Sequence, residues 1–291
     1  MLKNCLTFVA LAIIMAGCKK DAEVLEPQSV EPKMSVADSK MGLTLSDDLN
    51  ETSFESDALN PRICVYQFSV NDPIILDEED DPLNPKGVYD KGTKWANGKT
   101  LKVFFINGSD FLRGKVMTYA RKWAQHANIH FTVTENKANS DIRVGFKLNG
   151  DDGSWSKIGT DAKNYIGRQT MNFGWFNRQT DEREFSRVIV HEFGHAIGLG
   201  HEHLSPVANI NWNKPVVYKY YIEEEGWTRQ QVNQNIFNKY KERDVRNTRY
   251  DPKSIMHYYV PAEHTTDGVE VGYNLYLSEK DKAFIGRIYR N

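Results

Sequence analysis

Residues 191–201 read His-Glu-Phe-Gly-His-Ala-Ile-Gly-Leu-Gly-His and carry more chemical information than any other segment of the chain. His191 and His195 are four residues apart, so on a helix they share one face and can bind the same ion. Neutral imidazole is a good ligand for Zn²⁺, at about 2.0–2.1 Å. Glu192 lies beside the first histidine, where its carboxylate can reach water at the ion without binding the ion itself.

The second half of this segment supplies a third ligand. Gly198 allows the chain to turn sharply out of the helix, because glycine tolerates positive φ, and the turn can bring His201 to the ion. Three protein ligands leave one coordination position for water, as in catalytic rather than structural zinc sites. The alternative is a chance spacing of surface or core histidines. A bare H-E-x-x-H is compatible with chance, whereas the longer pattern on a predicted helix is far more specific.

Capping residues and hydrophobic spacing predict the elements around this segment. Asp181 and Glu184 form a capping-box pattern that starts the helix running through His191. Strands come first and helices later, which favours an α+β fold. We expect strands at 101–106, 129–134, 141–147 and 165–173, an amphipathic helix at 111–127, helical segments at 216–221 and 232–240, and a last helix capped by Ser278 and Asp281.

The segment is the metzincin motif H-E-x-x-H-x-x-G-x-x-H, and its surroundings resemble the astacin family of zinc metalloproteases. Glu202 follows the third histidine, as in astacins, and Ser254-Ile255-Met256-His257-Tyr258 resembles the astacin Met-turn. The resemblance covers roughly residues 91–291. Weaker similarity is carried by Trp95-Ala96-Asn97-Gly98-Lys99, Ser140-Asp141-Ile142, Trp155-Ser156-Lys157-Ile158-Gly159 and Leu277-Ser278-Glu279-Lys280-Asp281.

This resemblance implies a metzincin-type catalytic domain of the α+β class. It would have a twisted mixed sheet, an active-site helix and a mainly helical C-terminal subdomain. The implied activity is zinc-dependent endopeptidase cleavage of proteins or peptides, with one catalytic Zn²⁺. The resemblance assigns the ligand role to His191, His195 and His201 and the general-base role to Glu192.

Four other positions receive roles from the same resemblance. Met256 would form the apolar floor beneath the metal. Tyr258 would bind zinc at rest and swing to the reaction intermediate. Glu202 would pair with the new N-terminus of the processed enzyme, and Gly198 would make the turn before the third ligand. The disulfides of animal astacins are absent, and residues 204–206 depart from the animal pattern, so substrate preference is not carried over.

Two other classes of function stay open at this stage. One is a catalytically silent zinc-containing surface protein that binds peptides or glycans, although the intact Glu192 and Tyr258 argue against it. The other is a zinc hydrolase of a non-peptide amide, which the motif does not exclude. For a protease, we expect the strand at 169–173 to be the sheet edge against which an extended peptide pairs.

Composition limits the remaining choices. Of the 291 residues, 40% are hydrophobic and 26% charged, a globular profile, and the formal charge is 37 − 39 = −2. Without an overall basic excess we expect no nucleic-acid partner, and we expect a monomer.

The charge is divided unevenly along the chain. Residues 19–85 carry 5 basic and 16 acidic side chains, a net charge of −11, whereas residues 86–291 carry 31 basic and 23 acidic side chains, a net charge of +8. We therefore place the main domain boundary near Lys91.

The N-terminal residues have the pattern of a targeting signal. Lys3 precedes an apolar stretch over residues 6–17, too short to span a membrane. Met15-Ala16-Gly17-Cys18 resembles a bacterial lipobox, although an ordinary signal with a chance cysteine is the alternative. We expect residues 1–17 to be a signal peptide and residues 18–90 a lipid-anchored acidic tether or pro-segment, with lipidation at Cys18. The protein would then be exported and anchored in a bacterial cell envelope, at the outer membrane or cell surface.

The acidic segment could also keep the enzyme latent. Phe54-Glu55-Ser56-Asp57 has the spacing of the astacin Phe-x-Gly-Asp switch, with serine in place of glycine, so Asp57 could bind the zinc. Cys64 is a rival, because a thiolate also binds zinc well. An uninvolved tether is the third possibility.

For a few further residues, a functional role and a purely structural role are both possible. Residues 149–153 could bind Ca²⁺, but a plain turn is favoured. His203 and His257 flank the site, where packing around it is favoured over zinc ligation. The other histidines, His126, His130 and His264, are expected to be ordinary surface or core residues. The aromatic group Tyr218, Tyr220, Tyr221, Trp227, Phe237 and Tyr240 is interpreted as core of the C-terminal subdomain rather than a carbohydrate platform.

Overall fold

A computed structural model describes residue 64, residues 87–247 and residues 249–290. The predicted signal peptide, the lipidation site Cys18 and the motif that ends at Asp57 lie outside the described residues. These features therefore stay predictions. Cys64 is described, and its side chain is buried.

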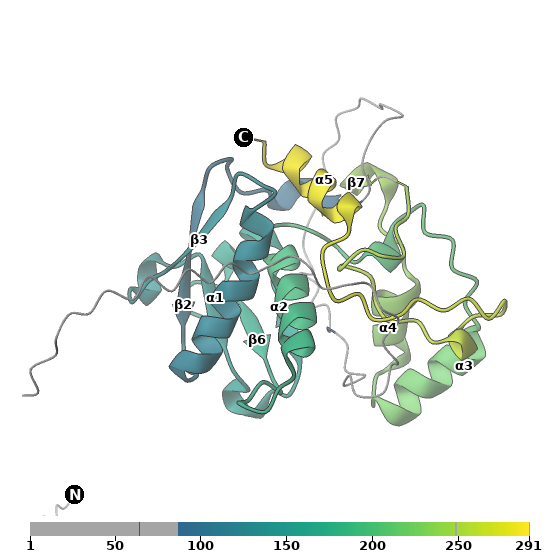
Figure 1. Ribbon diagram of the computed structural model, residues 1–291. Coiled ribbons are helices and arrows are strands. Elements are labelled where there is room, and N and C mark those ends of the chain that lie inside the picture. The colour runs from purple at the N-terminus through teal and green to yellow at the C-terminus, as the bar shows by residue number, and fades with distance from the viewer. Residues whose placement is uncertain (1–63, 65–86, 248, 291) are drawn as a thin grey trace, which may run out of the picture. The chain divides into compact units, whose positions relative to one another are not determined.

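A five-stranded mixed sheet forms one half of the folded part (Figure 1). The strand order is β3-β2-β4-β6-β5; the first four strands are parallel, and β5 is antiparallel to β6. Val103 of β2 pairs with Val133 of β3 and with Ile142 of β4. The predicted mixed sheet is confirmed. The strands are β2 (Thr100–Phe105), β3 (His130–Val133), β4 (Ile142–Gly145), β5 (Ser154–Ser156) and β6 (Met171–Phe173).

One prediction about this sheet was wrong. Strand β6 is not the edge, because it lies between β4 and β5. The edge next to β6 is β5, whose residues Ser154–Ser156 return antiparallel to β6, and the other edge of the sheet is β3. Both β5 and β6 have three residues, and which of them lies at the edge depends on strand pairing, which hydrophobic periodicity within one segment does not report.

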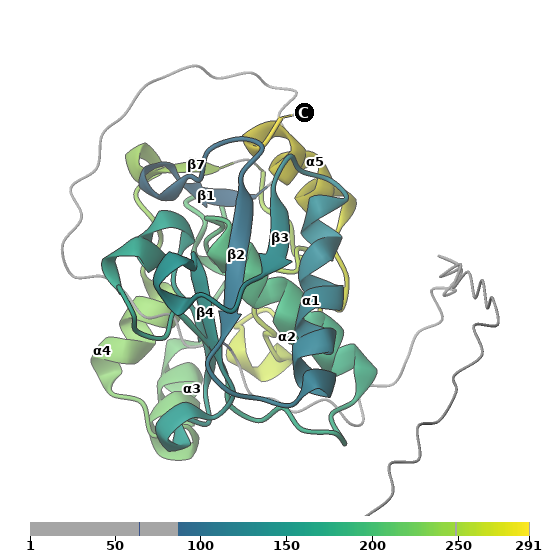
Figure 2. The same ribbon diagram turned by 90° about the vertical axis from the view of Figure 1, so that its left-hand side faces the viewer.

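Two long helices cover the same face of the sheet (Figures 1 and 2). They are α1 (Asp110–Ala124) and α2 (Glu182–Ala196). Both begin at a capping side chain: Ser109 Oγ accepts a hydrogen bond from the Leu112 amide, and Asp181 Oδ1 accepts one from Arg183 at 2.8 Å. The apolar face predicted for α1 is buried. The capping therefore places the start of α2 nine residues before the first histidine of the motif.

The C-terminal part is built from short helices and one long one. The chain forms α3 (Lys214–Lys219), which continues as a π-helix over Tyr220–Glu224, and α4 (Arg229–Val232), which continues as a π-helix over Asn233–Phe237. The predicted helix at 232–240 stops early because Asn238 is extended. The last helix, α5 (Glu279–Ile288), begins with the predicted capping box of Ser278 and Asp281. Strand β1 (Val88–Asp90), just before the predicted boundary, pairs with β7 (Val245–Asn247).

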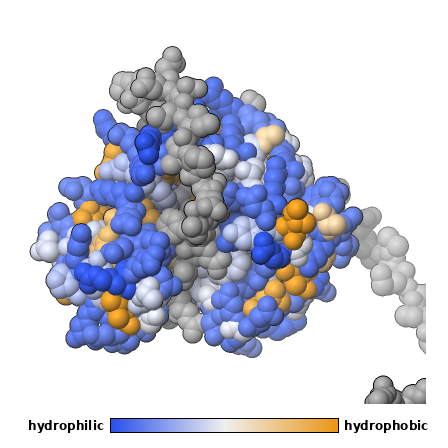
Figure 3. Space-filling view, turned by 180° about the vertical axis from the view of Figure 1, so that it is seen from behind, coloured by the Kyte–Doolittle hydropathy of each residue, from blue (hydrophilic) through white to orange (hydrophobic). Residues whose placement is uncertain are grey.

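Buried apolar side chains form two clusters. The larger one joins the sheet to α1, α2 and α5 and includes Met256. The smaller one contains Cys64, Val217, Tyr221 and Tyr258, with Tyr218, Tyr220, Trp227 and Phe237 packed against it. The aromatic group is thus core, as predicted, apart from Tyr240. The face in Figure 3 is mainly hydrophilic with small separate hydrophobic patches, and among the described residues no helix is long and apolar enough to cross a membrane.

Candidate metal centre

Three histidine nitrogens converge on one point at the end of α2. His195 Nε2 lies 3.1 Å from His191 Nε2 and 3.0 Å from His201 Nε2. All three side chains are buried. Zn–N distances of about 2.0–2.1 Å in a tetrahedral arrangement require ligand nitrogens about 3.3 Å apart, so the spacing suits one zinc ion.

The surroundings of the imidazoles favour the protonation state that a metal requires. The Nδ1 atoms of His191 and His195 lie 2.7 and 2.8 Å from the carbonyl oxygens of Ile255 and Leu199, to which they donate. Burial lowers the pKa of His195 to about 4 and lowers the pKa of the other two imidazoles well below the ordinary value. Neutral rings held in this tautomer direct Nε2 lone pairs at one another, which is favourable only around a cation.

Gly198 makes the turn that brings the third histidine to the first two. Its φ is +101°, and a Cβ there would lie 2.5 Å from the Tyr89 ring. The turn is held by the Leu199 amide, which donates to the Gly194 carbonyl at 2.9 Å. After the turn, the His201 amide donates to the Tyr240 hydroxyl at 3.0 Å. Any side chain at position 198 would meet both backbone strain and a collision.

Met256 lies against the helix that carries the first two histidines. A Cβ at Gly194 would come within 2.4 Å of its Sδ atom, so only glycine permits this approach. The Met256 carbonyl accepts a hydrogen bond from the Glu202 amide at 3.0 Å. The Met-turn and the segment after the third histidine are thereby joined through the backbone.

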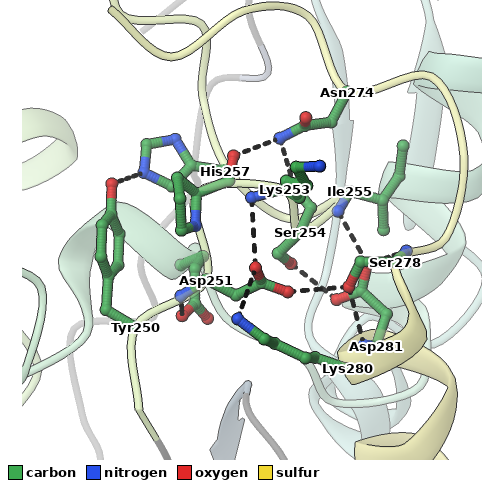
Figure 4. Close-up of polar contacts among 12 residues, drawn as sticks. Tyr250, Asp251, Lys253, Ser254, Ile255, His257, Asn274, Ser278, Lys280 and Asp281 are labelled. Atoms are coloured by element: carbon green, nitrogen blue, oxygen red, sulfur yellow. Dashed lines mark hydrogen bonds and ion pairs between the residues drawn. The ribbon is translucent and has the colours of Figure 1, made fainter. Parts of the chain in front are cut away.

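A polar network fixes the Met-turn from the other side (Figure 4). Asp281 accepts from the Ser254 hydroxyl at 2.7 Å and from the Ile255 amide at 2.8 Å. Asp251 accepts from the Ser278 hydroxyl at 2.8 Å and pairs with Lys280 at 3.2 Å. Because the Ile255 carbonyl also accepts from a ligand histidine, this network orients the first imidazole.

Cys64 completes the group of candidate ligands. Its sulfur and the three histidine nitrogens all lie within 4.8 Å of one another. Cysteine sulfur is a strong zinc ligand, and Cys₁His₃ is a chemically suitable tetrahedral donor set. Burial raises the pKa of the Cys64 thiol well above its ordinary value, and Glu192 raises it further. A bound cation would reverse this effect by stabilising the thiolate.

Glu192 is fully buried beside the fourth ligand. Its Oε2 accepts from the Cys64 thiol at 3.5 Å, while its Oε1 has no hydrogen-bond partner among the described residues. Burial raises the pKa of Glu192 to about 8, although Arg187 lowers it. The carboxylate therefore lies next to the Cys64 sulfur.

Tyr258 also contacts Cys64. Its hydroxyl donates to the Cys64 carbonyl, and its ring centroid lies 4.4 Å from that of His201. Burial raises the pKa of the Tyr258 hydroxyl well above its ordinary value, so at neutral pH it is a donor. The structure thus brings this tyrosine beside two of the three histidines.

A small cavity of about 20 Å³ adjoins these groups and contains residues that the sequence analysis missed. Arg187 lies one helical turn before His191 and reaches the cavity, where its guanidinium pairs with Glu184 at 2.7 Å. Trp175 donates to the same carboxylate at 3.0 Å. The four-residue spacing on α2 is a signal that could have found Arg187. The cavity is lined by Cys64, Trp175, Arg187, Val188, His191, Glu192, Ile255, His257, Tyr258, Tyr259, Tyr273 and Asn274.

Glu202 is buried close to the metal centre but is directed away from the ligand group. Its Oε1 accepts from the Asp251 amide at 2.8 Å, and its Oε2 has no partner among the described residues. Burial raises the pKa of this carboxyl well above its ordinary value, and the neighbouring Asp281 and Asp251 raise it further. A cation placed at Oε2 would remove this penalty.

The remaining candidates have other partners. His203 Nε2 lies 2.8 Å from the Asn235 carbonyl, and His257 Nε2 lies 2.6 Å from the Tyr250 hydroxyl, so both pack around the site. In the candidate calcium loop, Asp151 accepts from the Gly153 amide and from the Trp155 indole. Asp152 pairs with Lys147 at 2.6 Å. These contacts are those of a plain turn.

Comparison with known proteins agrees with this geometry. Residues 87–271 match the family model described as Astacin (Peptidase family M12A). The chain belongs to the astacin family. It is similar to a structure of myroilysin, with 41% identity and a TM-score of 0.68, over 70% of this chain and 99% of that chain. A crystal structure of myroilysin is 40% identical with a TM-score of 0.53, over 75% and 95% of the two chains.

A weaker likeness links the chain to high choriolytic enzyme 1, a hatching-enzyme zinc protease from the medaka fish Oryzias latipes. The two are 18% identical with a TM-score of 0.46, over 71% of this chain and 98% of that chain. No curated protein matches the chain. As a member of the astacin family, the protein is a zinc metalloendopeptidase that acts on proteins or peptides. The predicted family, fold class, activity and zinc cofactor are confirmed.

Proposed function

We propose that His191, His195 and His201 hold the catalytic zinc and that Glu192 is the general base for peptide-bond hydrolysis. When bound, zinc lowers the pKa of water and polarises a carbonyl group. Glu192 takes a proton from the attacking water and passes it to the leaving amine. The observation that carries this proposal is the buried Glu192 carboxylate beside three convergent imidazole nitrogens. A zymogram with a chelator and with zinc restored tests it, and also separates a protease from the two alternative functions.

Tyr258 and the edge strand complete the proposed reaction. The tyrosine hydroxyl, once released from the Cys64 carbonyl, donates to the oxyanion that develops on the substrate. Among the residues that the structure describes, strand β5 pairs only with β6, so its other edge can accept an extended peptide in place of the edge first predicted. Met256 supports the metal site from below, as its contact with α2 suggests.

The same proposal includes latency through Cys64. With its sulfur among the ligand nitrogens, water has no access to the fourth position, and Glu192 has no water to activate. The rival residue, Asp57, lies outside the described residues. We expect full-length Cys64→Ala to cleave casein without prior processing, whereas the full-length wild type should be inactive. Equal activity of the two unprocessed proteins would remove Cys64 from the mechanism.

Activation by cleavage would give Glu202 its missing partner. The Val88 carbonyl accepts from the Gly200 amide, and the Asp90 amide donates to the Gly198 carbonyl. Strand β1 therefore runs antiparallel to residues 198–200, and its N-terminal end is directed toward Glu202. A new ammonium group at Gly87, produced by cleavage after Lys86, would come close to the unpartnered oxygen. N-terminal sequencing of the activated enzyme tests this position, and a mature N-terminus downstream of β1 would refute it.

The location of the protein completes the proposal. The lipobox-like ending at Cys18 and the acidic run behind it support a signal peptide over residues 1–17 and a lipid anchor in a bacterial envelope. The segment 18–90 would then serve as both tether and pro-segment, ahead of a monomeric catalytic domain. Cys18→Ala should move the protein from the membrane to the soluble fraction. Membrane partitioning equal to that of the wild type would exclude the anchor.

A further inference from the structure

A second cavity adjoins the catalytic one on the side of the C-terminal subdomain. It has a volume of about 120 Å³, which corresponds to about four water molecules at roughly 30 Å³ each. Tyr259, the residue after Tyr258, lines both cavities, so the second cavity is a neighbour of the first. Its lining consists of aromatic, acidic and histidine side chains: Tyr220, Tyr221, Glu225, Tyr259, Pro261, Glu263 and His264.

The charges around this cavity are all negative. Glu225 and Glu263 are exposed, and among the described residues no lysine or arginine pairs with either of them. Burial and then Glu225 raise the pKa of Tyr220 to about 12, and burial followed by Glu270 and Glu263 raises the pKa of Tyr259. No cation opposes these effects. The negative potential is unexpected in a region, residues 86–291, whose net charge is +8.

The tyrosines and the histidine form the walls of the cavity. The Tyr220 ring lies 5.1 Å from the Tyr221 ring and 5.0 Å from the His264 ring, and the Tyr220 hydroxyl donates to Glu225 at 3.1 Å. His264 is only 3% exposed, and its ring also lies 6.0 Å from the Tyr221 ring. Burial lowers the pKa of His264, so the neutral imidazole has a lone pair that can accept a proton donor.

We propose that this cavity is a substrate subsite that binds a lysine or arginine side chain close to the scissile bond. Tyrosine faces attract a cation within about 6 Å, and the two carboxylates at the rim add Coulombic attraction. The volume suits the end of an extended basic side chain but not a folded peptide segment. The subsite deepens the proposed function, on which it rests, by naming the class of peptide that the enzyme prefers.

Matched peptides test the subsite on the activated enzyme prepared from the full chain. Each pair of fluorogenic peptides differs only by lysine or norleucine at one of the three positions on either side of the cleaved bond. We expect kcat/KM to be roughly tenfold higher for lysine at one of these positions. The double variant Glu225→Gln, Glu263→Gln should reduce the ratio below about twofold while the norleucine peptide is cleaved at the wild-type rate. The double variant Glu135→Gln, Glu242→Gln, an equal change of charge at exposed positions outside the cavity, should leave the ratio unchanged.

Two results would overturn the subsite. One is equal cleavage of lysine and norleucine peptides at every position, and the other is an unchanged ratio in the double variant. Chelator-sensitive cleavage of casein by the same preparation shows that the protease itself is intact. A failure of the subsite is thus distinguishable from a failure of the proposed function, in which casein would not be cleaved at all.

Discussion

The Met-turn network and the metal centre are both buried and polar, but they differ in how completely their carboxylate oxygens are hydrogen-bonded by the protein. In the network, both carboxylate oxygens of Asp281 and of Asp251 have protein donors. Around the metal centre, one carboxylate oxygen of Glu192 and one of Glu202 have no partner among the described residues. Buried polar groups are normally paired, so the exceptions mark places where another group binds or reacts.

This difference distinguishes residues that support the site from residues that take part in the reaction. The network holds the backbone that orients His191, and its residues need not touch the substrate. The unpartnered carboxylates border the positions assigned to water and to the new N-terminus. Changes in the first region should therefore alter stability more than rate, and changes in the second should alter rate more than stability.

The largest effect is expected from removing a ligand. In the activated enzyme, from which Cys64 has been removed, His195→Ala should lose zinc and activity together, because two histidines and water hold zinc poorly. Metal analysis of the purified protein and casein cleavage measure the two losses. His130→Ala, at an exposed histidine on β3, is the control and should keep full zinc and activity. Stoichiometric zinc in His195→Ala would exclude this residue as a ligand.

At Glu192, the proposed general base, we expect a severe loss of activity without a loss of zinc. Glu192→Ala in the activated enzyme should keep stoichiometric zinc and lose at least about 10²-fold in kcat, since general acid–base catalysis typically contributes 10²–10⁴-fold. Glu135→Gln should be neutral in the same assay. If Glu192→Ala cleaved casein or gelatin at nearly the wild-type rate, the catalytic role of Glu192 would be refuted.

A milder loss is expected at the oxyanion donor. Tyr258→Phe should keep its fold and zinc and lose roughly 10–10³-fold in kcat, because one donor to the developing charge is missing. Tyr276→Phe, at a tyrosine that is 57% exposed, is the matched control. An effect on KM alone would mean that Tyr258 binds substrate rather than stabilising the oxyanion.

Substitutions in the Met-turn network should mainly lower the free energy of unfolding. Asp281→Ala leaves the Ser254 hydroxyl and the Ile255 and Ser278 amides without their acceptor, and we expect a loss of about 2–4 kcal/mol in the free energy of unfolding. Denaturant titration measures this loss. Glu279→Ala, at an exposed position on the same helix, should change stability by less than about 0.5 kcal/mol. A loss of kcat in Asp281→Ala as large as that of Glu192→Ala, with stability unchanged, would erase the distinction between the two regions.

The smallest effect concerns pH. Burial raises the pKa of Asp281 to about 6, although three donors lower it, so between about pH 4 and pH 6 the folded chain binds more protons than the unfolded chain at this position. Its contribution to stability therefore falls as the pH rises, with a slope of at most about 1.4 kcal/mol per pH unit. Asp281→Asn, which does not titrate, should lack this slope. Identical pH profiles for the wild type and Asp281→Asn would show that the carboxyl does not titrate in this range.

Local signals in the sequence predicted the elements that depend on neighbouring residues. Asp181 predicted the start of α2, and Ser278 with Asp281 predicted the capping box of α5. The spacing of His191 and His195 predicted that they share a helical face. These predictions hold because capping and helical periodicity operate over three or four residues.

Features that depend on distant pairing were not available from the sequence. The edge position went to β5 rather than β6 because sheet order depends on which strands pair, and this information is absent from a three-residue strand. The second role of Asp281, as acceptor for the Ser254 hydroxyl 27 residues away, appears only once α5 packs under the Met-turn.

By itself, the sequence predicted the family, the cluster of three histidines and the glutamate beside it, because their spacing is a property of one helix and one turn. Only the tertiary structure decided which side chains from other segments lie beside these residues. It brought the thiol of Cys64, 127 residues before His191, to the fourth position, and it left one oxygen of Glu202 unpartnered. Such placements follow from how separate segments pack together, and packing depends on the whole core rather than on any local pattern.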